Sequence, residues 1–96
     1  MEQNYTLIPT NRFKKDLKKL SEEVREKAEE TVDQLSKNPK HPGLRSKKNY
    51  QWTKHMGFAT FECSINMSYR IIYSIENNRI ILLHAVGNHQ VVEKTR

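Results

Sequence analysis

The segment from Phe58 to His89 constrains the fold of this chain more than any other, because it concentrates the β-branched and aromatic residues of an otherwise highly charged protein. Three apolar runs lie within it, at 58–65, 69–75 and 80–86, and polar turn residues separate them at 66–68 and 76–79. Runs of this length and composition, bounded by turn residues, predict three consecutive β-strands.

The first two runs alternate between two kinds of residue. Their odd-numbered positions are apolar or aromatic: Ala59, Phe61, Cys63, Ile65, Tyr69, Ile71, Tyr73 and Ile75. Glu62, Ser64 and Arg70 stand at even positions, so we expect them to share the opposite face of the sheet. The pair Asn77-Asn78 favours a two-residue hairpin, since asparagine tolerates positive φ. Such a turn would place Tyr73 opposite Leu82 and Arg70 opposite Ala85.

A helical hairpin is predicted before this segment. A short strand at 4–8 is expected to stop at Pro9, and a helix then begins at Thr10 or Asn11. A second helix begins at Ser21 and ends at Asn38, because the residue before a proline avoids the helical region. Apolar residues recur at helical spacing along both helices, at Phe13, Leu17, Leu20, Val24, Ala28, Val32 and Leu35.

These elements predict an α+β fold in a single domain spanning residues 1–96. The N-terminal strand and the helical hairpin would pack on one face of a small antiparallel sheet. The other face would stay open, with Arg70 on it. Val91-Val92 are expected to extend the last strand.

The charge of the chain favours a polyanionic partner. Its 96 residues include 17 Lys and Arg against 11 Asp and Glu, for a net charge of +6. RNA, DNA or an acidic protein would complement this surface, although a simply solvated surface is the alternative. Cys63 is the single cysteine and cannot form an internal disulfide, which fits a reducing cytosol. The N-terminus lacks the features of a signal peptide, and no stretch is apolar enough to span a membrane, so a cytoplasmic protein is expected.

The segment 39–57 shows no clean periodicity and is basic, with Tyr50 and Trp52 interleaved. Cations for phosphates and flat rings for bases are what single-stranded RNA requires. The candidate RNA-binding residues are Arg45, Lys47, Lys48, Trp52, Lys54 and His55. The alternative for Trp52 is that it pins the loop to the core.

Arg70 and His89 are the candidate catalytic residues. An arginine in an apolar strand is costly to desolvate unless it meets an anion. That anion is either Glu62 on the neighbouring strand or the phosphate of a ligand. His89 follows the last strand, where it could transfer a proton in phosphodiester cleavage, although a lone surface histidine is usually inert. His84 is expected to be a packed core residue paired with Ile71.

The order of these elements resembles the RelE/ParE superfamily of toxins of type II toxin–antitoxin systems, in particular the RelE-type mRNA interferases. The similar segments lie at 12–20, 38–48, 61–62, 66–73 and 86–89, and include Asn-Met-Ser-Tyr-Arg-Ile-Ile-Tyr and Val-Gly-Asn-His. The resemblance covers nearly the whole chain. It implies a RelE-like fold and a metal-independent endoribonuclease, without cofactor, that cleaves mRNA in the ribosomal A site. It also implies a cognate antitoxin as partner.

The resemblance further implies roles for individual residues. Arg70 matches the strand arginine that stabilises the phosphorane, and His89 matches a general-acid position. Glu62 is a candidate general base from its register alone, with His55 as the alternative. Lys47, Lys48 and Lys54 would hold RNA phosphates.

The chain also departs from the pattern of that branch. Ser64 stands where relatives often carry a basic residue, and Glu93 stands where many carry an aromatic. In that branch the loop usually continues with Leu-Lys-Gly after the paired lysines, whereas this chain has Asn49-Tyr50-Gln51 there. Two alternatives therefore remain: a ParE-like inhibitor of DNA gyrase, or a binding module with weakened catalysis. The lysine-rich first helix and the open sheet face could bind an acidic antitoxin segment, and the strand at 4–8 could accept a strand.

Overall fold

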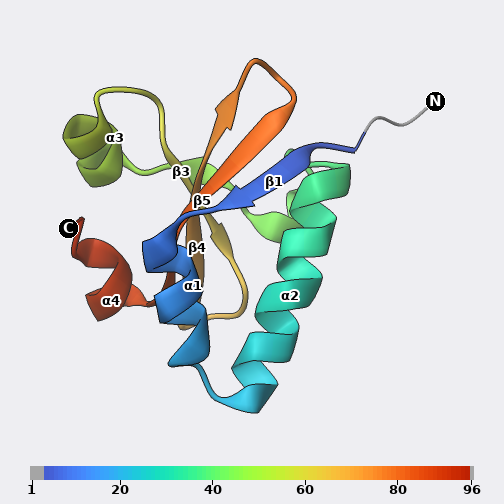
Figure 1. Cartoon of the computed structure of the whole chain (residues 1–96), viewed down its shortest axis with the longest axis vertical. Coiled ribbons are helices and arrows are strands. Elements are labelled where there is room, and N and C mark those ends of the chain that lie inside the picture. Colours follow the sequence, from blue (N-terminus) through green and yellow to red (C-terminus); the bar gives the residue numbers. More distant parts are fainter. Residues whose placement is uncertain (1–3, 96) are drawn as a thin grey trace.

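A five-stranded sheet forms the centre of the structure, a computed structural model that describes residues 4–95 (Figure 1). Its strand order is β1-β5-β4-β3-β2. The strands are β1 (Thr6–Pro9), β2 (Lys47–Lys48), β3 (Phe61–Ser64), β4 (Tyr69–Glu76) and β5 (Ile80–Asn88). β1 runs parallel to β5, and the other neighbours are antiparallel. The α+β class is confirmed.

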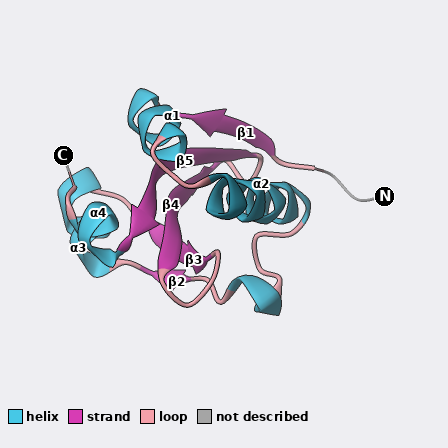
Figure 2. Cartoon of the chain, turned by 90° about the horizontal axis from the view of Figure 1, so that it is seen from below, coloured by secondary structure: helices cyan, strands magenta, loops and turns pink. Residues whose placement is uncertain are grey.

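The helices lie on both faces of this sheet. They are α1 (Asn11–Lys18), α2 (Glu22–Lys37), α3 (Tyr50–Met56) and α4 (His89–Glu93), with a short 3₁₀ turn, η1, at Pro42–Leu44. Figure 2 shows α1 and α2 on one side of the strands, and α3 and α4 together at the other. None of the helices in the described part of the chain is long and apolar enough to cross a membrane.

The predicted helical hairpin is confirmed at its boundaries. The Thr10 side chain accepts a hydrogen bond from the Phe13 amide, and the Ser21 side chain accepts one from the Val24 amide. Each bond satisfies an amide that the first turn of a helix leaves unpaired. The second helix ends with Asn38 as its C-cap, as the following proline predicts.

The main core lies between α1, α2 and the odd-numbered face of the sheet. It combines the helix residues Phe13, Ala28 and Leu35 with strand residues, and Leu17, Val24 and Val32 pack against it. The strand residues in this core are Cys63, Ile71, Tyr73, Ile81, Leu83 and Val86. The predicted burial of the odd-numbered positions is confirmed for Cys63, Ile71 and Tyr73. Four others pack against the core while partly buried, namely Phe61, Ile65, Tyr69 and Ile75, whereas Ala59 is exposed.

The opposite face of the sheet is not open, which corrects the prediction. Trp52 of α3 and Val92 of α4 form a second core cluster with Ile72 and Ala85, and Met56 packs against it. Both helices were missed in the sequence. The Asn49 side chain caps α3 by accepting from the Trp52 amide, and Gly57 ends it with a φ of 83°. Such an αL residue commonly terminates a helix.

The last residues also differ from the prediction. Val91 and Val92 belong to α4 and do not extend β5. The Asn88 side chain accepts from the Val91 amide and so caps this short helix. α4 then folds back over the sheet instead of continuing it.

The β4–β5 register differs from the predicted one by two residues at the end of the hairpin that carries Arg70. The hairpin loop holds three residues rather than two, so Tyr73 lies opposite Leu83 and not Leu82. A β-bulge then leaves His84 without a partner, and Arg70 lies opposite Gly87 and not Ala85. His84 is buried as expected, but Ile71 pairs with Val86.

Two strand boundaries also shift. β1 begins at Thr6 rather than at residue 4 and includes Pro9, which an edge strand tolerates because one side of it needs no amide donor. β3 begins at Phe61 rather than at Phe58. The backbone oxygen of Thr60 instead accepts hydrogen bonds from the Asn49 amide, just before α3, and from the Thr53 hydroxyl within α3.

Candidate functional site

An ion pair between β4 and β3 forms the centre of the candidate site. Arg70 Nε lies 3.6 Å from Glu62 Oε2, and the two side chains are 17% and 16% exposed. Ser64 is the register partner of Arg70, so the three even-numbered side chains share one face as predicted. Arg70 Nη1 also donates to the Asn66 oxygen at 2.6 Å. The guanidinium is therefore held in place while part of it still reaches solvent.

The other carboxylate oxygen of Glu62 is also engaged. Asn49 Nδ2 donates to Glu62 Oε1 at 3.0 Å, and Asn49 itself caps α3. The carboxylate thus joins β3 to α3 and Arg70 at once. The sequence suggested two anions for Arg70, the carboxylate of Glu62 or the phosphate of a ligand. In this structure Arg70 forms an ion pair with Glu62.

A pocket beside this pair exposes two arginines. It has a volume of about 330 Å³ and is lined by Gly43, Arg45, Ser64, Ile65, Asn66, Met67 and Arg70. Arg45 adopts a left-handed backbone, with a φ of 50°, at the end of η1. Non-glycine residues in this conformation are uncommon and concentrate at functional sites. The lining carries two guanidinium groups and no carboxylate, which suits an anion.

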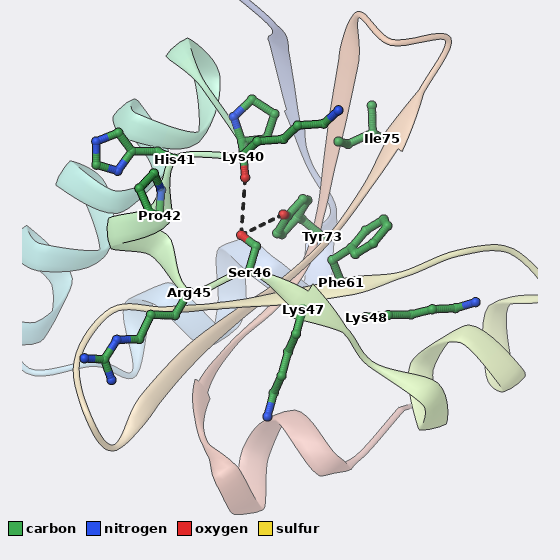
Figure 3. Close-up of a pocket in the computed structure, with 11 residues that line it drawn as sticks. Lys40, His41, Pro42, Arg45, Ser46, Lys47, Lys48, Phe61, Tyr73 and Ile75 are labelled. Atoms are coloured by element: carbon green, nitrogen blue, oxygen red, sulfur yellow. Dashed lines mark hydrogen bonds between the residues drawn. The ribbon is translucent and has the colours of Figure 1, made fainter.

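Lys47 and Lys48 form the short edge strand β2 and point in different directions (Figure 3). Lys47 pairs with Glu62, and Lys48 pairs with Phe61. Because neighbouring residues of a strand project to opposite faces, Lys47 lies on the face of Arg70 and Lys48 on the other. The Lys48 ammonium lies 5.6 Å from the ring centre of Tyr50.

His89 is the first residue of α4 and is exposed. It follows Asn88, which pairs with Tyr69 next to Arg70. No hydrogen bond or ion pair within residues 4–95 joins His89 to Arg70 or Glu62. The strand register thus brings His89 to the same end of the sheet, without a direct contact.

Gly87 explains how α4 approaches this end of the sheet. It is buried opposite Arg70, and a β-carbon built there would lie 2.7 Å from Val91 Cβ. Only a glycine leaves room for α4 at this distance.

The assignment of Trp52 as an RNA-binding residue is wrong, because the structure buries its side chain. Its side chain is only 3% exposed, and Nε1 donates to the Val92 oxygen at 2.6 Å. It stacks on His84 and therefore cannot receive a base. Tyr50, 77% exposed on α3, is the aromatic side chain that remains available to stack on a base. Its place close to Lys48 in the basic segment is the sequence signal that could have identified it.

Lys54 and His55 occupy the last turn of α3 and are exposed. The His55 ring lies 6.1 Å from that of Trp52 in a T-shaped arrangement. No hydrogen bond or ion pair among the described residues connects His55 to Arg70 or Glu62. The structure thus brings Glu62, but not His55, into contact with Arg70.

Two further titratable side chains, those of His84 and Cys63, are buried outside this site. His84 bonds Ser74 Oγ through Nε2 at 2.8 Å, and burial lowers its pKa below the ordinary 6.5. Burial also raises the pKa of Cys63 to about 12, so its thiol stays protonated and unreactive at neutral pH. In residues 4–95 no group of three His, Cys, Asp or Glu side chains could hold a metal ion.

Comparison with known proteins agrees with this fold. Residues 7–92 match a family model described as the ParE toxin of the type II toxin–antitoxin system parDE. The archaeal RelE–RelB complex of Pyrococcus horikoshii OT3 contains a similar chain, with a TM-score of 0.70 and 16% identity over 88% of this chain and 94% of that one. A search of the curated proteins returned no match.

Two other solved structures are also similar. A chain of the RelBE2 toxin–antitoxin complex of Mycobacterium tuberculosis has a TM-score of 0.67 and 20% identity, over 90% of this chain and 99% of that one. A mutant of the E. coli toxin RelE in the free state has a TM-score of 0.57 and 20% identity, over 88% and 83%. At these identities the likeness shows the fold, which is RelE-like.

Proposed function

Because this chain belongs to the ParE toxin family of type II toxin–antitoxin systems, within the RelE/ParE superfamily, we propose that it is a toxin that cleaves mRNA. In this proposal it is a metal-independent endoribonuclease that inhibits translation in the cytoplasm by acting on mRNA in the ribosomal A site. A cognate antitoxin, like the RelB partners of the similar RelE structures, would keep it inactive.

The observation that carries the proposal is the pocket shared by Arg45 and Arg70. A phosphodiester placed there would meet two guanidinium groups, and Arg70 is already oriented by Glu62 and the Asn66 oxygen. Preorganised donors of this kind stabilise the charge that develops in a transition state without a cost of reorganisation. Lys47, on the same face, would hold an adjacent phosphate.

The reaction would proceed by attack of the RNA 2′-hydroxyl on the neighbouring phosphorus. A base removes the 2′ proton as the new P–O bond forms, and Arg70 stabilises the phosphorane. The bond to the 5′ oxygen then breaks, and an acid donates a proton to that oxygen. The products are a 2′,3′-cyclic phosphate and a 5′-hydroxyl, so neither water nor a metal is consumed in this step.

His89 is proposed as the acid, since it is exposed at the end of the sheet next to the Arg70 register position. Glu62 is proposed as the base, because Oε1 accepts a single hydrogen bond, from Asn49, and Oε2 is held near Arg70 by an ion pair that leaves its lone pairs able to accept a proton. His55 is the alternative base. Lys48, Lys54 and Tyr50 would then bind the flanking nucleotides, with Tyr50 as the stacking ring.

The test is induction of the protein in a bacterial host, followed by mapping of mRNA 5′ ends. We expect growth arrest and new 5′-hydroxyl ends within translated regions. Purified protein incubated with programmed ribosomes, and with free mRNA, would show whether the A site is required. Growth arrest without new mRNA ends would remove the nuclease proposal.

A second function, inhibition of DNA gyrase, is favoured by one observation: the matching family model is that of ParE. It predicts a DNA-damage response on induction and inhibition of supercoiling by purified gyrase. Substitution of Arg70 would then leave toxicity unchanged. A protein that causes neither response would be a binding module with weakened catalysis.

A further inference from the structure

A second pocket lies between η1, β2 and the strands, and it shares Arg45 with the pocket of Arg70. Its volume is about 550 Å³, and Figure 3 shows the side chains around it. The lining consists of Pro39, Lys40, His41, Pro42, Arg45, Ser46, Lys47, Lys48, Phe61, Tyr73 and Ile75. We call this the Tyr73 pocket.

The floor of the Tyr73 pocket is apolar and rigid. The rings of Phe61 and Tyr73 stack with their centres 5.7 Å apart. The Tyr73 hydroxyl donates to Ser46 Oγ at 2.9 Å, and that oxygen donates in turn to the Pro39 carbonyl at 3.3 Å (Figure 3). The hydroxyl groups at the floor are therefore already paired, and the exposed part of the floor suits an apolar side chain.

The rim of the Tyr73 pocket is cationic. Lys40, Arg45, Lys47 and Lys48 line it and are exposed. Of the described residues in the lining, none is acidic. An apolar floor inside a ring of cations complements a segment in which carboxylates flank one large apolar side chain.

We propose that the Tyr73 pocket binds an acidic peptide segment of the antitoxin through one aromatic or aliphatic anchor residue. A nucleobase fits less well, because a base needs free polar partners at its edge and the floor hydroxyls are already paired. The pocket also opens on the face opposite the Arg70 ion pair, as the alternation of Phe61 and Glu62 along β3 requires.

Binding there would act on the lysines of β2. Carboxylates around the anchor would pair with Arg45, Lys47 and Lys48, which the proposed function assigns to RNA. The segment could thus weaken RNA binding without covering Arg70 or His89. This consequence rests on the proposed function, whereas peptide binding itself does not.

The experiment is a titration of the ¹⁵N-labelled protein with capped pentapeptides, followed by NMR amide shifts. The probe is Asp-Glu-Phe-Glu-Asp, and the matched peptide Asp-Glu-Ser-Glu-Asp keeps its charge but lacks the anchor. We expect saturable shifts at residues 40–48, Phe61 and Tyr73, with a Kd of about 1 mM or tighter for the phenylalanine peptide. The serine peptide should bind at least about fivefold more weakly, because burial of the ring is lost.

Charge reversal on the protein provides the second arm. Lys40→Glu places a carboxylate on the rim and should weaken the phenylalanine peptide by about fivefold. Lys18→Glu changes the net charge equally on exposed α1, outside the pocket, and should change the Kd by less than about twofold. Neither lysine belongs to the proposed RNA-binding set, so cleavage should persist in both variants.

Three results would overturn the inference. They are an absence of saturable shifts at the pocket, equal binding of both peptides, or preferential binding of a non-cleavable 2′-O-methyl RNA pentamer at Phe61 and Tyr73. Peptide binding by a protein that cuts no mRNA would support the proposed peptide site and refute the proposed nuclease activity. Cleavage without peptide binding would do the reverse.

Discussion

The indole nitrogen of Trp52 donates a 2.6 Å hydrogen bond to the main-chain oxygen of Val92, which joins α3 to α4 across the sheet face that carries Arg70. Two further side chains hold the same helix end. Gln51 donates to the Glu93 oxygen at 2.7 Å, and Arg12 of α1 donates to the oxygens of Val91 and Lys94. The position of His89 therefore depends on residues far from it in sequence.

Trp52→Phe should destabilise the fold by about 1–2 kcal/mol, because it leaves the buried Val92 oxygen without its donor while most of the apolar contact remains. Equilibrium unfolding in urea measures this change. Tyr50→Phe on the same helix is the control and should change stability by less than about 0.5 kcal/mol, since Tyr50 is exposed. Equal stability of both variants would contradict the anchoring role of Trp52.

Arg70→Ala should reduce mRNA cleavage by about 100-fold or more, because the developing phosphorane charge loses its preorganised donor. Arg70→Lys keeps the charge but not the planar fork, and should recover only part of the activity. Primer extension on a translated message measures both. The matched control is Arg79→Ala, an exposed arginine in the β4–β5 turn, which should cut normally. Normal cleavage by Arg70→Ala would refute the site.

His89→Gln should reduce cleavage by about 100-fold if it donates the proton to the leaving oxygen. The side chain is exposed, so the unfolding midpoint should stay unchanged. His41→Gln, at the start of η1, is the control. A substrate with a 5′-thio leaving group, which needs no acid, should be cut equally by wild type and His89→Gln; a persistent defect on it would argue against the acid role.

Glu62→Gln should reduce cleavage by about 100-fold if Glu62 is the base, although Gln keeps a polar oxygen beside Arg70. Primer extension on a translated message measures the loss in this variant. Activity within about threefold of wild type would leave Glu62 as the ion-pair partner of Arg70 only, and His55→Gln would then be the variant to compare.

Stability should fall with acidification because of His84. Its pKa in the folded protein lies below the ordinary 6.5, so the unfolded chain binds the proton first as the pH falls. The contribution is fully present above pH 6.5 and is lost progressively from there down to the folded pKa. Urea unfolding between pH 8 and 5 measures it, and His84→Gln should flatten the slope.

Gly87→Ala should displace α4, because its β-carbon would lie 2.7 Å from Val91 Cβ. We expect a loss of about 1–3 kcal/mol, as for overpacked core sites, and lower cleavage through the displaced His89. Gly57→Ala is the comparison: it also costs stability, because its φ is 83°, but it meets no atom and should leave α4 in place. NMR shifts at residues 89–93 distinguish the two.

Local patterns were sufficient to predict most elements of the main core. The alternation of apolar and polar residues predicted that Glu62, Ser64 and Arg70 share one face. The N-capping residues Thr10 and Ser21 predicted where the first two helices begin. The β4–β5 register could not be predicted, because a three-residue loop and the bulge at His84 each add one residue. A bulge depends on what packs against it, here the ring of Trp52.

The helices on the second face were missed for a different reason. α3 and α4 are one to two turns long, so each shows too few apolar positions for a period to appear. The capping residues Asn49 and Gly57 were visible, but the segment between them is polar except for Trp52 and Met56. The pocket of Arg45 and Arg70 was likewise unpredictable, since it requires the left-handed turn at Arg45.

The two-residue strand β2 has one further consequence. Lys47 lies on the face of Arg70 and Lys48 on the other, yet both line the Tyr73 pocket. Arg45 also lines both the Tyr73 pocket and the pocket of Arg70. Ligands on the two faces would therefore share the charges of Arg45 and Lys47, and their affinities are linked thermodynamically. If a bound peptide lowers RNA affinity by some factor, bound RNA must lower peptide affinity by the same factor. A message held on one face would thus promote release of the inhibitor from the other.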